Sequence, residues 1–324
     1  MSVRGAVPSL PDTIDPLKPQ QVAARLECAG VQRGRSATRT LVLLGLLGGV
    51  YIGFGGALAT LVLSDHSIGY GLGRLAAGVA FSLGLIMLIL AGGELFTGNS
   101  LMVLAVASRR LSVASLMRNW VITYVANAVG AVALAIVIHQ SGILDGGDVK
   151  TTATKIAESK AHLAASAAFT RGFLCNMLVC LAVWMSVAAR SLEGKVIAII
   201  FPISAFVALG LEHCIANFYL LPIGMLNGAN VSVIDLIRNL VFVTLGNLAG
   251  GCVLAMAYWF AYLDDGTSAH GLAAASRPAL RLIGSMQQAV ASRAARILGS
   301  NALERMTPLD STTRVQAPTD MDVH

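Results

Sequence analysis

Six long runs of apolar residues, rich in Ile, Leu, Val and Ala, follow one another along the chain between short polar connections. They cover residues 41–63, 72–107, 119–138, 169–189, 196–226 and 234–263. An α-helix rises about 1.5 Å per residue, so about 20 apolar residues cross the roughly 30 Å hydrocarbon layer of a membrane. The pattern therefore predicts six transmembrane helices in a single domain at residues 41–263.

The second and fifth runs each exceed thirty residues, and a straight helix of that length would overshoot the bilayer by about 15 Å. In the second run, AGGELFTGNS (residues 91–100) has three glycines around Glu94, Thr97 and Asn99. In the fifth, LGLEHCIANFYL (residues 209–220) brings a glutamate and a histidine into an apolar stretch. Non-helical backbone at membrane depth is tolerated only where protein or a water-filled cavity satisfies its amides. We therefore expect both helices to break around a pore or a binding site.

The two halves of the chain resemble each other. ELFTGN (94–99) and EHCIAN (212–217) share a glutamate followed five residues later by an asparagine. RNWVITYVANAVG (118–130) and RNLVFVTLGNLAG (238–250) share Arg-Asn, a second Asn eight residues later, and Gly three residues after that. Three spans separate the copies, so they enter the membrane from opposite faces. The fold class predicted is an all-α membrane protein built as an inverted 3+3 repeat.

The composition agrees with a membrane protein, because 56% of the residues are hydrophobic and only 12% are charged, about half the share in a soluble domain. Lys and Arg near membrane spans stay on the cytoplasmic side. They gather in the amino-terminal segment, the second-to-third and fourth-to-fifth connections and the tail. Both termini are therefore predicted to be cytoplasmic. The net charge of +6 follows from this bias, and no nucleic-acid partner is expected.

Two segments lie outside the spans. Residues 1–40 contain no apolar run, so we expect no cleavable signal peptide, and the first span would direct insertion. Within this cytoplasmic segment, QQVAARLECAGVQRGR predicts a short amphipathic helix lying on the cytoplasmic surface. Residues 264–324 form a predicted cytoplasmic tail rich in Arg, Ser and Ala, which fits either an amphipathic surface helix or disorder.

Motifs for covalent or metal chemistry are missing from the sequence. The five cysteines show neither Cys-x-x-Cys nor a His/Cys metal spacing, so no disulfide framework, metal or cofactor is expected. A membrane-embedded hydrolase would need a nucleophile with a base, and neither Gly-x-Ser-x-Gly nor His-Glu-x-x-His occurs. The protein is predicted not to be an enzyme.

Five segments resemble the signature sequences of the formate/nitrite transporter family. They are GGELFTGN, NWVITYVANAVGA, GFLCNMLVCLAVWMS, FVALGLEHCIANFYLLPIG and VTLGNLAGG, and the resemblance covers residues 20–263. It implies an aquaporin-like protomer, a homopentamer with one pore in each protomer, and passage of small monovalent anions or their conjugate acids. The Asn-Pro-Ala repeats of aquaporins are replaced by TGN and IAN at the two breaks.

His213 is the first candidate for the pore. An ionisable side chain inside a membrane is costly and faces a cavity or a partner, and imidazole titrates near its unperturbed pKa of about 6.5. The resemblance implies a histidine at the pore centre, tied to proton-linked, pH-dependent transport. Glu212 points about 100° away around a helix, so we expect it to anchor the broken backbone. Glu94, Asn99 and Asn217, in matching positions of the repeat, are assigned the same supporting role.

The resemblance implies roles for three further residues. Thr97 would face the histidine across the pore, although a threonine there could also cap a helix. Asn176 would lie beside the histidine, although an amide within the fourth span could equally make an interhelical hydrogen bond. Lys160, at the outer edge of the fourth span, matches a vestibule lysine that attracts anions, with a solvated loop lysine as the alternative.

Five apolar residues are candidates for constrictions. Phe81 and Leu85 share a helix face, Phe206 shares the face of the histidine, and Leu95 and Phe96 lie in the first break. Spacing alone favours core packing for each of them. The resemblance implies two hydrophobic slits above and below the histidine, which exclude hydrated ions.

The substrate is left open between formate and nitrite, hydrosulfide or acetate. FLCNMLVCLAVWMS favours the formate channels, and a neutral-solute channel of aquaporin type is the rival that the same architecture permits. The expected partners are the small anion, protons, the lipid bilayer and further copies of the chain. The expected location is a bacterial inner membrane.

Overall fold

The computed structural model describes residues 15–264, and all regular secondary structure in this range is helical. The elements are α1 (Pro19–Gly34), α2 (Thr38–Leu63), α3 (Tyr70–Met87), η1 (Leu88–Gly92), η2 (Gly98–Met102), α4 (Val103–Ala107), α5 (Val113–Gln140), η3 (Ile143–Asp145), α6 (Val149–Ala161), α7 (Ala165–Ala188), α8 (Leu192–Ala208), α9 (Cys214–Leu226) and α10 (Val233–Tyr262). The predicted tail at 264–324 lies outside the described residues, except for its first position.

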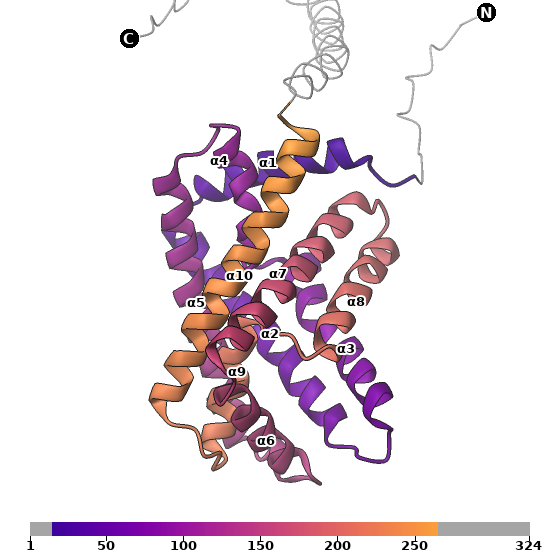
Figure 1. Cartoon of the computed structure of the whole chain (residues 1–324), viewed down its shortest axis with the longest axis vertical. Helices are drawn as coiled ribbons and strands as arrows, with labels where there is room; N and C mark the ends of the chain where they lie inside the picture. The colour runs from indigo at the N-terminus through magenta and orange to yellow at the C-terminus, as the bar shows by residue number, and fades with distance from the viewer. Residues whose placement is uncertain (1–14, 265–324) are drawn as a thin grey trace, which may run out of the picture. The chain divides into compact units, whose positions relative to one another are not determined.

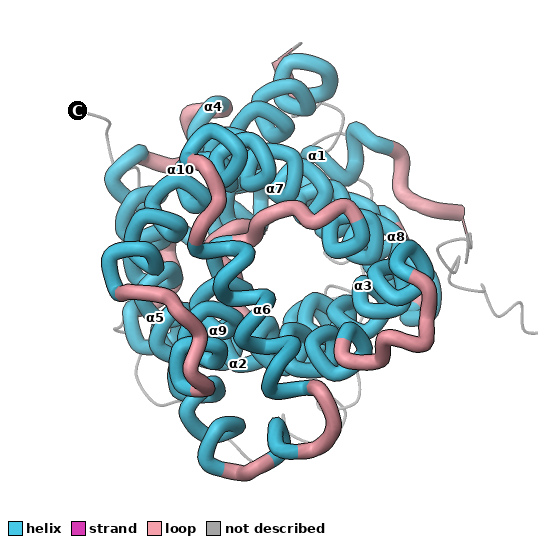
Figure 2. The backbone as a smooth tube through the Cα atoms, turned by 60° about the horizontal axis from the view of Figure 1, so that its bottom comes forward, coloured by secondary structure: helices cyan, strands magenta, loops and turns pink. Residues whose placement is uncertain are grey.

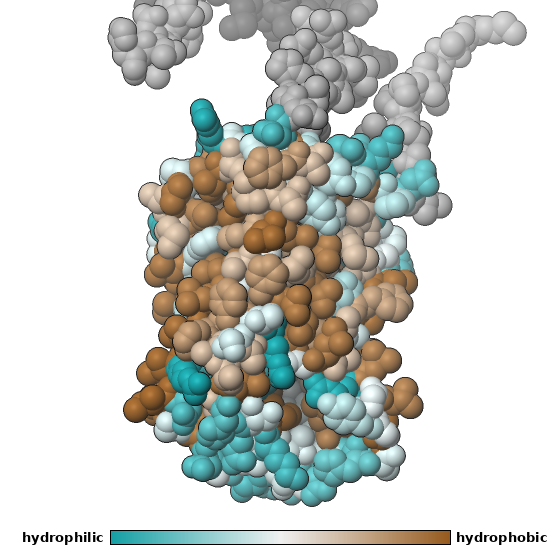
Figure 3. Space-filling view, viewed as in Figure 1, coloured by the Kyte–Doolittle hydropathy of each residue, from teal (hydrophilic) through white to brown (hydrophobic). Residues whose placement is uncertain are grey.

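Five helical segments are long and apolar enough to cross a membrane: α2, α3 with η1, α5, α7 and α10. The predicted fifth span is instead divided between α8 and α9, of 17 and 13 residues. Apolar side chains cover the middle of the bundle on the face shown in Figure 3, and polar side chains gather towards the end that carries α6. The protein is therefore a multi-pass membrane protein.

Both predicted breaks are present, and each contains a glycine with left-handed backbone. The second span stops at Gly92, with φ of 91°, and resumes at Gly98. The fifth stops at Ala208, passes through Gly210 with φ of 69°, and resumes at Cys214. Residues with a Cβ rarely adopt this backbone region, so glycine permits the chain to leave each helix sharply.

The glycines of the repeated Arg-Asn motifs permit close helix packing in each half. A Cβ on Gly130 of α5 would lie 2.1 Å from the backbone oxygen of Leu46 on α2. A Cβ on Gly250 of α10 would lie 2.0 Å from the backbone oxygen of Phe173 on α7. Both distances are far below van der Waals contact, so the two helix pairs pack backbone to backbone only because these positions lack a side chain.

The first and last described helices meet at one end of the bundle (Figure 1). Here α1 covers η2, α4 and α7 with a buried face that includes Val22, Ala23 and Leu26. We call this the α1 end. The connection between α2 and α3 lies with α6 at the opposite α6 end, from which Figure 2 shows α3 and α8 side by side.

Candidate functional site

The two broken spans meet at a contact between His213 and Thr97. The imidazole Nε2 lies 2.9 Å from the Thr97 hydroxyl oxygen, and both side chains are buried. The other ring nitrogen, Nδ1, accepts a hydrogen bond of 3.1 Å from the backbone N–H of Ala216 and so caps the start of α9. Because Nδ1 is an acceptor, the neutral imidazole carries its proton on Nε2 and donates it to Thr97.

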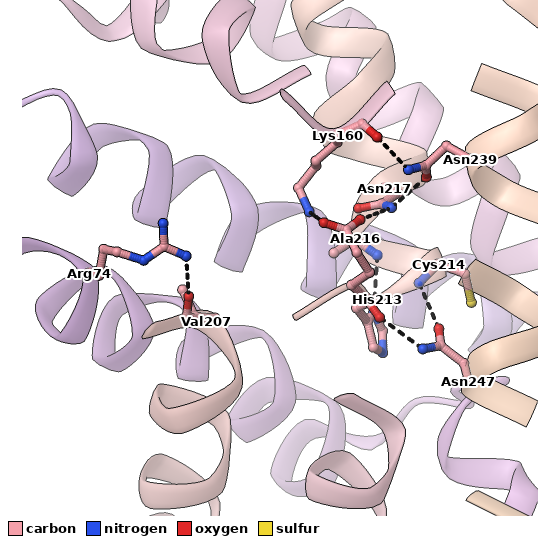
Figure 4. A network of polar contacts seen from close by, with 10 residues as sticks. Arg74, Lys160, Val207, His213, Cys214, Ala216, Asn217, Asn239 and Asn247 are labelled. Atoms are coloured by element: carbon pink, nitrogen blue, oxygen red, sulfur yellow. Dashed lines mark hydrogen bonds and ion pairs between the residues drawn. The ribbon is translucent and has the colours of Figure 1, made fainter. Parts of the chain in front are cut away.

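Next to this histidine, a network of polar side chains supports the second break (Figure 4). The Lys160 ammonium donates to Glu212 Oε1 at 2.9 Å, and the Asn217 amide donates to Glu212 Oε2 at 2.8 Å. Asn217 also donates to Asn239, which in turn donates to the Lys160 carbonyl. Glu212 thus contacts groups from α6 and α9 and holds the non-helical segment between them.

Lys160 differs from its prediction in position. It lies in the last turn of α6, a separate helix before the fourth span, and not at the edge of that span. Its side chain is 17% exposed and paired with Glu212, so it is not a solvated loop lysine. Position along the chain could not indicate this, because α6 is a short helix packed against α9.

An equivalent network supports the first break at the α1 end. Glu94 accepts from Asn99 at 2.8 Å and faces the Arg33 guanidinium at 3.3 Å. Asn99 also donates to Asn119, which donates to the Arg33 carbonyl. Every contact repeats that of the other half, with Arg33 of α1 in the place of Lys160 of α6. The sequence repeat revealed the glutamates and asparagines but not the two cations, since these lie in helices without matching motifs.

The second asparagine of each repeated motif satisfies the backbone of a break. The side-chain amides of Asn127 and Asn247 each donate to two carbonyls, one of which belongs to the glutamate of that half. Their amide oxygens accept the backbone N–H groups of Phe96 and Cys214 at 3.0 and 2.8 Å. Buried backbone groups that lack helical partners are costly, so these two amides make non-helical chain stable inside the bundle.

A cavity of about 550 Å³ at the α6 end reaches His213 and the ring pair Phe81–Phe206. The two phenylalanine rings meet edge to face with centroids 5.3 Å apart, and Phe206 stacks on the imidazole at 6.1 Å. Four basic side chains line the cavity: Arg74, Lys155, Lys160 and Arg171. Its acidic lining residues are Asp65 and Glu212, and the second is already paired with Lys160. The cavity therefore carries an excess of positive charge. Three of its basic residues, Arg74, Lys155 and Arg171, were not among the candidates from the sequence.

The remaining constriction candidates do not line this cavity. Leu85, Leu95 and Phe96 are buried, and Phe96 packs edge to face against Tyr124, with centroids 4.7 Å apart. Leu95 and Phe96 belong to the first break, between η1 and η2.

Asn176 makes interhelical hydrogen bonds. Its amide donates to the carbonyls of Thr97 at 3.2 Å and Asn247 at 2.6 Å, and to the hydroxyl of Ser100 at 3.2 Å. Within the described chain, its hydrogen bonds reach the residue that faces His213 and not His213 itself. In residues 15–264, no three His, Cys, Asp or Glu side chains converge as a metal ion requires, and the cysteines are unpaired.

The protein is an apolar helical bundle with two broken spans. The two breaks meet at a buried histidine, which a basic cavity reaches from the α6 end. These features define a membrane channel or transporter. Residues 20–260 match the family model described as formate/nitrite transporter. The chain belongs to the formate/nitrite transporter family. This is a family of transport proteins and not of enzymes.

Individual relatives agree with this assignment. The chain is 40% identical over 245 residues to a probable formate transporter of Methanothermobacter thermautotrophicus, covering 69% of this chain and 89% of that protein. It is 33% identical over 274 residues to the formate channel FocA of Escherichia coli, covering 78% and 96%. A solved structure described as a pentameric formate channel with formate bound matches with a TM-score of 0.65 and 38% identity, over 70% of this chain and 98% of the other.

Proposed function

We propose that this protein conducts small monovalent anions across a bacterial inner membrane, with formate as its principal substrate, as a homopentamer with both termini in the cytoplasm. The relatives described as formate channels, one of them pentameric with formate bound, support the substrate and the assembly. The basic cavity that closes on a phenylalanine pair and a buried His–Thr contact is the observation that carries the proposal.

The proposed path begins in the cavity at the α6 end. Cations concentrate anions at a mouth with low-dielectric walls, so Lys155 and Arg171 raise the local formate concentration, while Glu212 offsets the charge of Lys160. Phe81 and Phe206 then form an apolar slit that a small acid or a partly dehydrated anion enters and a hydrated ion does not.

Beyond the slit, His213 and Thr97 replace lost hydration and handle the proton. The imidazole N–H and the Thr97 hydroxyl are buried polar groups that can exchange their mutual hydrogen bond for one to the permeating anion. A second proton on the imidazole would occupy Nδ1, which now accepts the Ala216 amide. Protonation is thereby coupled to the cap of α9, and we propose that permeation is pH-dependent for this reason.

Flux into proteoliposomes tests the substrate. We expect labelled formate to enter faster than in empty liposomes, with nitrite, acetate and hydrosulfide compared in the same preparation. The basic cavity disfavours the aquaporin-type rival, because a channel for neutral solutes has no use for these cations. Accelerated water or glycerol flux without formate flux would overturn the proposal in favour of that rival.

Assembly and orientation have independent tests. Valines of α5 at a spacing of four, Val121, Val125 and Val129, are exposed on the protomer and offer an apolar face to lipid or to a neighbouring copy. Native mass spectrometry in mild detergent should give a pentamer, and a stable monomer or trimer would contradict it. The exposed thiol of Cys28 on α1 should react with an impermeant maleimide only from the cytoplasmic side.

A further inference from the structure

Arg74 joins the two helices that carry the phenylalanine slit. It lies near the start of α3, and its guanidinium reaches the last residues of α8 (Figure 4). Its Nε donates to the Ala208 carbonyl at 2.7 Å, and its Nη2 donates to the Val207 carbonyl at 3.1 Å. Among the described residues, these are the side-chain hydrogen bonds between α3 and α8.

The bonds satisfy a local need of α8. The last carbonyls of a helix lack α-helical partners. At the end of α8 the carbonyls of Phe206 and Val207 accept the backbone N–H groups of Leu211 and Gly210, so Arg74 supplies a donor to Ala208 and a second donor to Val207. A cation at a helix C-terminus also interacts favourably with the helix dipole. The planar guanidinium directs separate N–H groups at two adjacent carbonyls in a fixed geometry, which suits this position better than a flexible ammonium.

The surroundings hold the guanidinium in place. A Cβ on Gly210 would lie 2.6 Å from Arg74 Nη2, so glycine leaves the room that the side chain occupies. Tyr70, one turn earlier on α3, places its ring centroid 5.5 Å from the guanidinium carbon and its hydroxyl 3.4 Å from Nη1.

The same helix pair forms the slit. Phe81 follows Arg74 by two helical turns and so lies on the same face of α3, while Phe206 directly precedes the two bonded carbonyls. Between these points the backbones approach closely, because a Cβ on Gly78 would lie 2.6 Å from the Ser204 carbonyl oxygen. The separation of the Phe81 and Phe206 rings therefore depends on how the end of α8 is held against α3.

We propose that Arg74 is a positioning residue for substrate selectivity: by holding the end of α8 against α3, it keeps the Phe81–Phe206 slit narrow enough to favour formate over larger monocarboxylates. This inference rests on the proposed anion-channel function. Arg74 acts through the position of Phe206. Its loss should therefore change how well the channel discriminates between small and large monocarboxylates, in addition to weakening the attraction of anions to the cavity.

The ratio of lactate flux to formate flux in proteoliposomes tests the inference. Arg74→Met removes both hydrogen bonds and should raise this ratio by about threefold or more, within the range that small changes in pocket size produce. Lys155→Met is the matched control, because it removes an equal charge from the same cavity at an exposed side chain. The control should lower formate uptake at low salt without changing the ratio. An unchanged ratio in Arg74→Met, or equal changes in both variants, would overturn the inference.

Two further measurements keep the test decisive. In a Phe206→Ala background the slit is already open, so Arg74→Met should add nothing to the ratio, and an additive change would refute the coupling. Arg74→Lys keeps the positive charge but loses the planar group that donates to both carbonyls. If Arg74→Met does not fold, this variant replaces it in the test. A wild-type lactate-to-formate flux ratio in Arg74→Lys would then refute the role of Arg74. Absent formate flux in the wild-type protein would instead refute the proposed function.

Discussion

Replacing Glu212 by Gln perturbs the second break at its centre. The carboxylate accepts from Lys160 through one oxygen and from Asn217 through the other. A glutamine side chain has only one acceptor oxygen, so either the ammonium or the amide loses its partner. Removing one member of a buried ion pair costs about 3–5 kcal/mol. Lys160 retains some solvent contact, at 17% exposure, so we expect about 3 kcal/mol.

The inverted repeat supplies a matched comparison. Glu94→Gln makes the same change in the first break, but the partner Arg33 is 30% exposed and its contact is longer, 3.3 Å against 2.9 Å for Lys160. Solvent screening reduces the loss there to about 1–2 kcal/mol. Glu212→Gln should therefore destabilise the protein more than Glu94→Gln does.

The protein's own cysteines provide the assay. Cys175, Cys180 and Cys214 are buried, so a thiol-reactive coumarin maleimide reports unfolding during heating, after Cys28 has reacted at the outset. The apparent midpoints should fall in the order wild type, Glu94→Gln, Glu212→Gln. Adding Lys160→Met to Glu212→Gln removes the unpaired cation and should recover part of the loss. Equal midpoints for the two single variants, or no recovery in the double variant, would refute this reasoning.

Three other predictions concern the pore and the packing. His213→Asn should abolish the pH dependence of formate uptake, because an amide does not titrate, whereas Thr97→Val should slow uptake but keep the pH profile; a wild-type profile in His213→Asn would make the histidine structural. Phe206→Ala should raise the lactate-to-formate flux ratio by about threefold or more, and an unchanged ratio would show that the ring only packs. Gly49→Ala should destabilise by about 1–3 kcal/mol, because its Cβ would lie 2.1 Å from the Asn127 carbonyl oxygen, while Gly71→Ala, with open space around it, should leave the maleimide midpoint unchanged.

Much of the fold could be predicted because its signals are local. Apolar runs of spanning length mark the helices, and both breaks were expected at Glu94 and at Glu212, where glycines and polar residues interrupt those runs. The fifth span is divided into α8 and α9, as its excessive length indicated. The sequence repeat also pointed to the asparagines that support the breaks, since each half needs the same amides to satisfy the same non-helical backbone.

The partners across the bundle could not be predicted. Arg33, Lys160 and Arg74 are ordinary basic residues in the sequence, and their contacts with Glu94, Glu212 and the end of α8 form only when distant helices pack together. The sequence likewise did not distinguish which of the five constriction candidates line the cavity. Periodicity shows which residues share a helix face but not whether that face points to the cavity or to the core.

Composition and local spacing, taken alone, determined a multi-pass helical membrane protein with two broken spans and a histidine in one of them, because bilayer crossing and helix breaking depend on residues close together in the chain. Only the tertiary structure decided that Thr97 and His213 share a hydrogen bond, that Phe81 and Phe206 close the basic cavity, and that Phe96 packs elsewhere. These outcomes depend on the rotation and depth of each helix in the bundle, which are set by backbone contacts at glycines and by buried ion pairs between segments far apart in sequence.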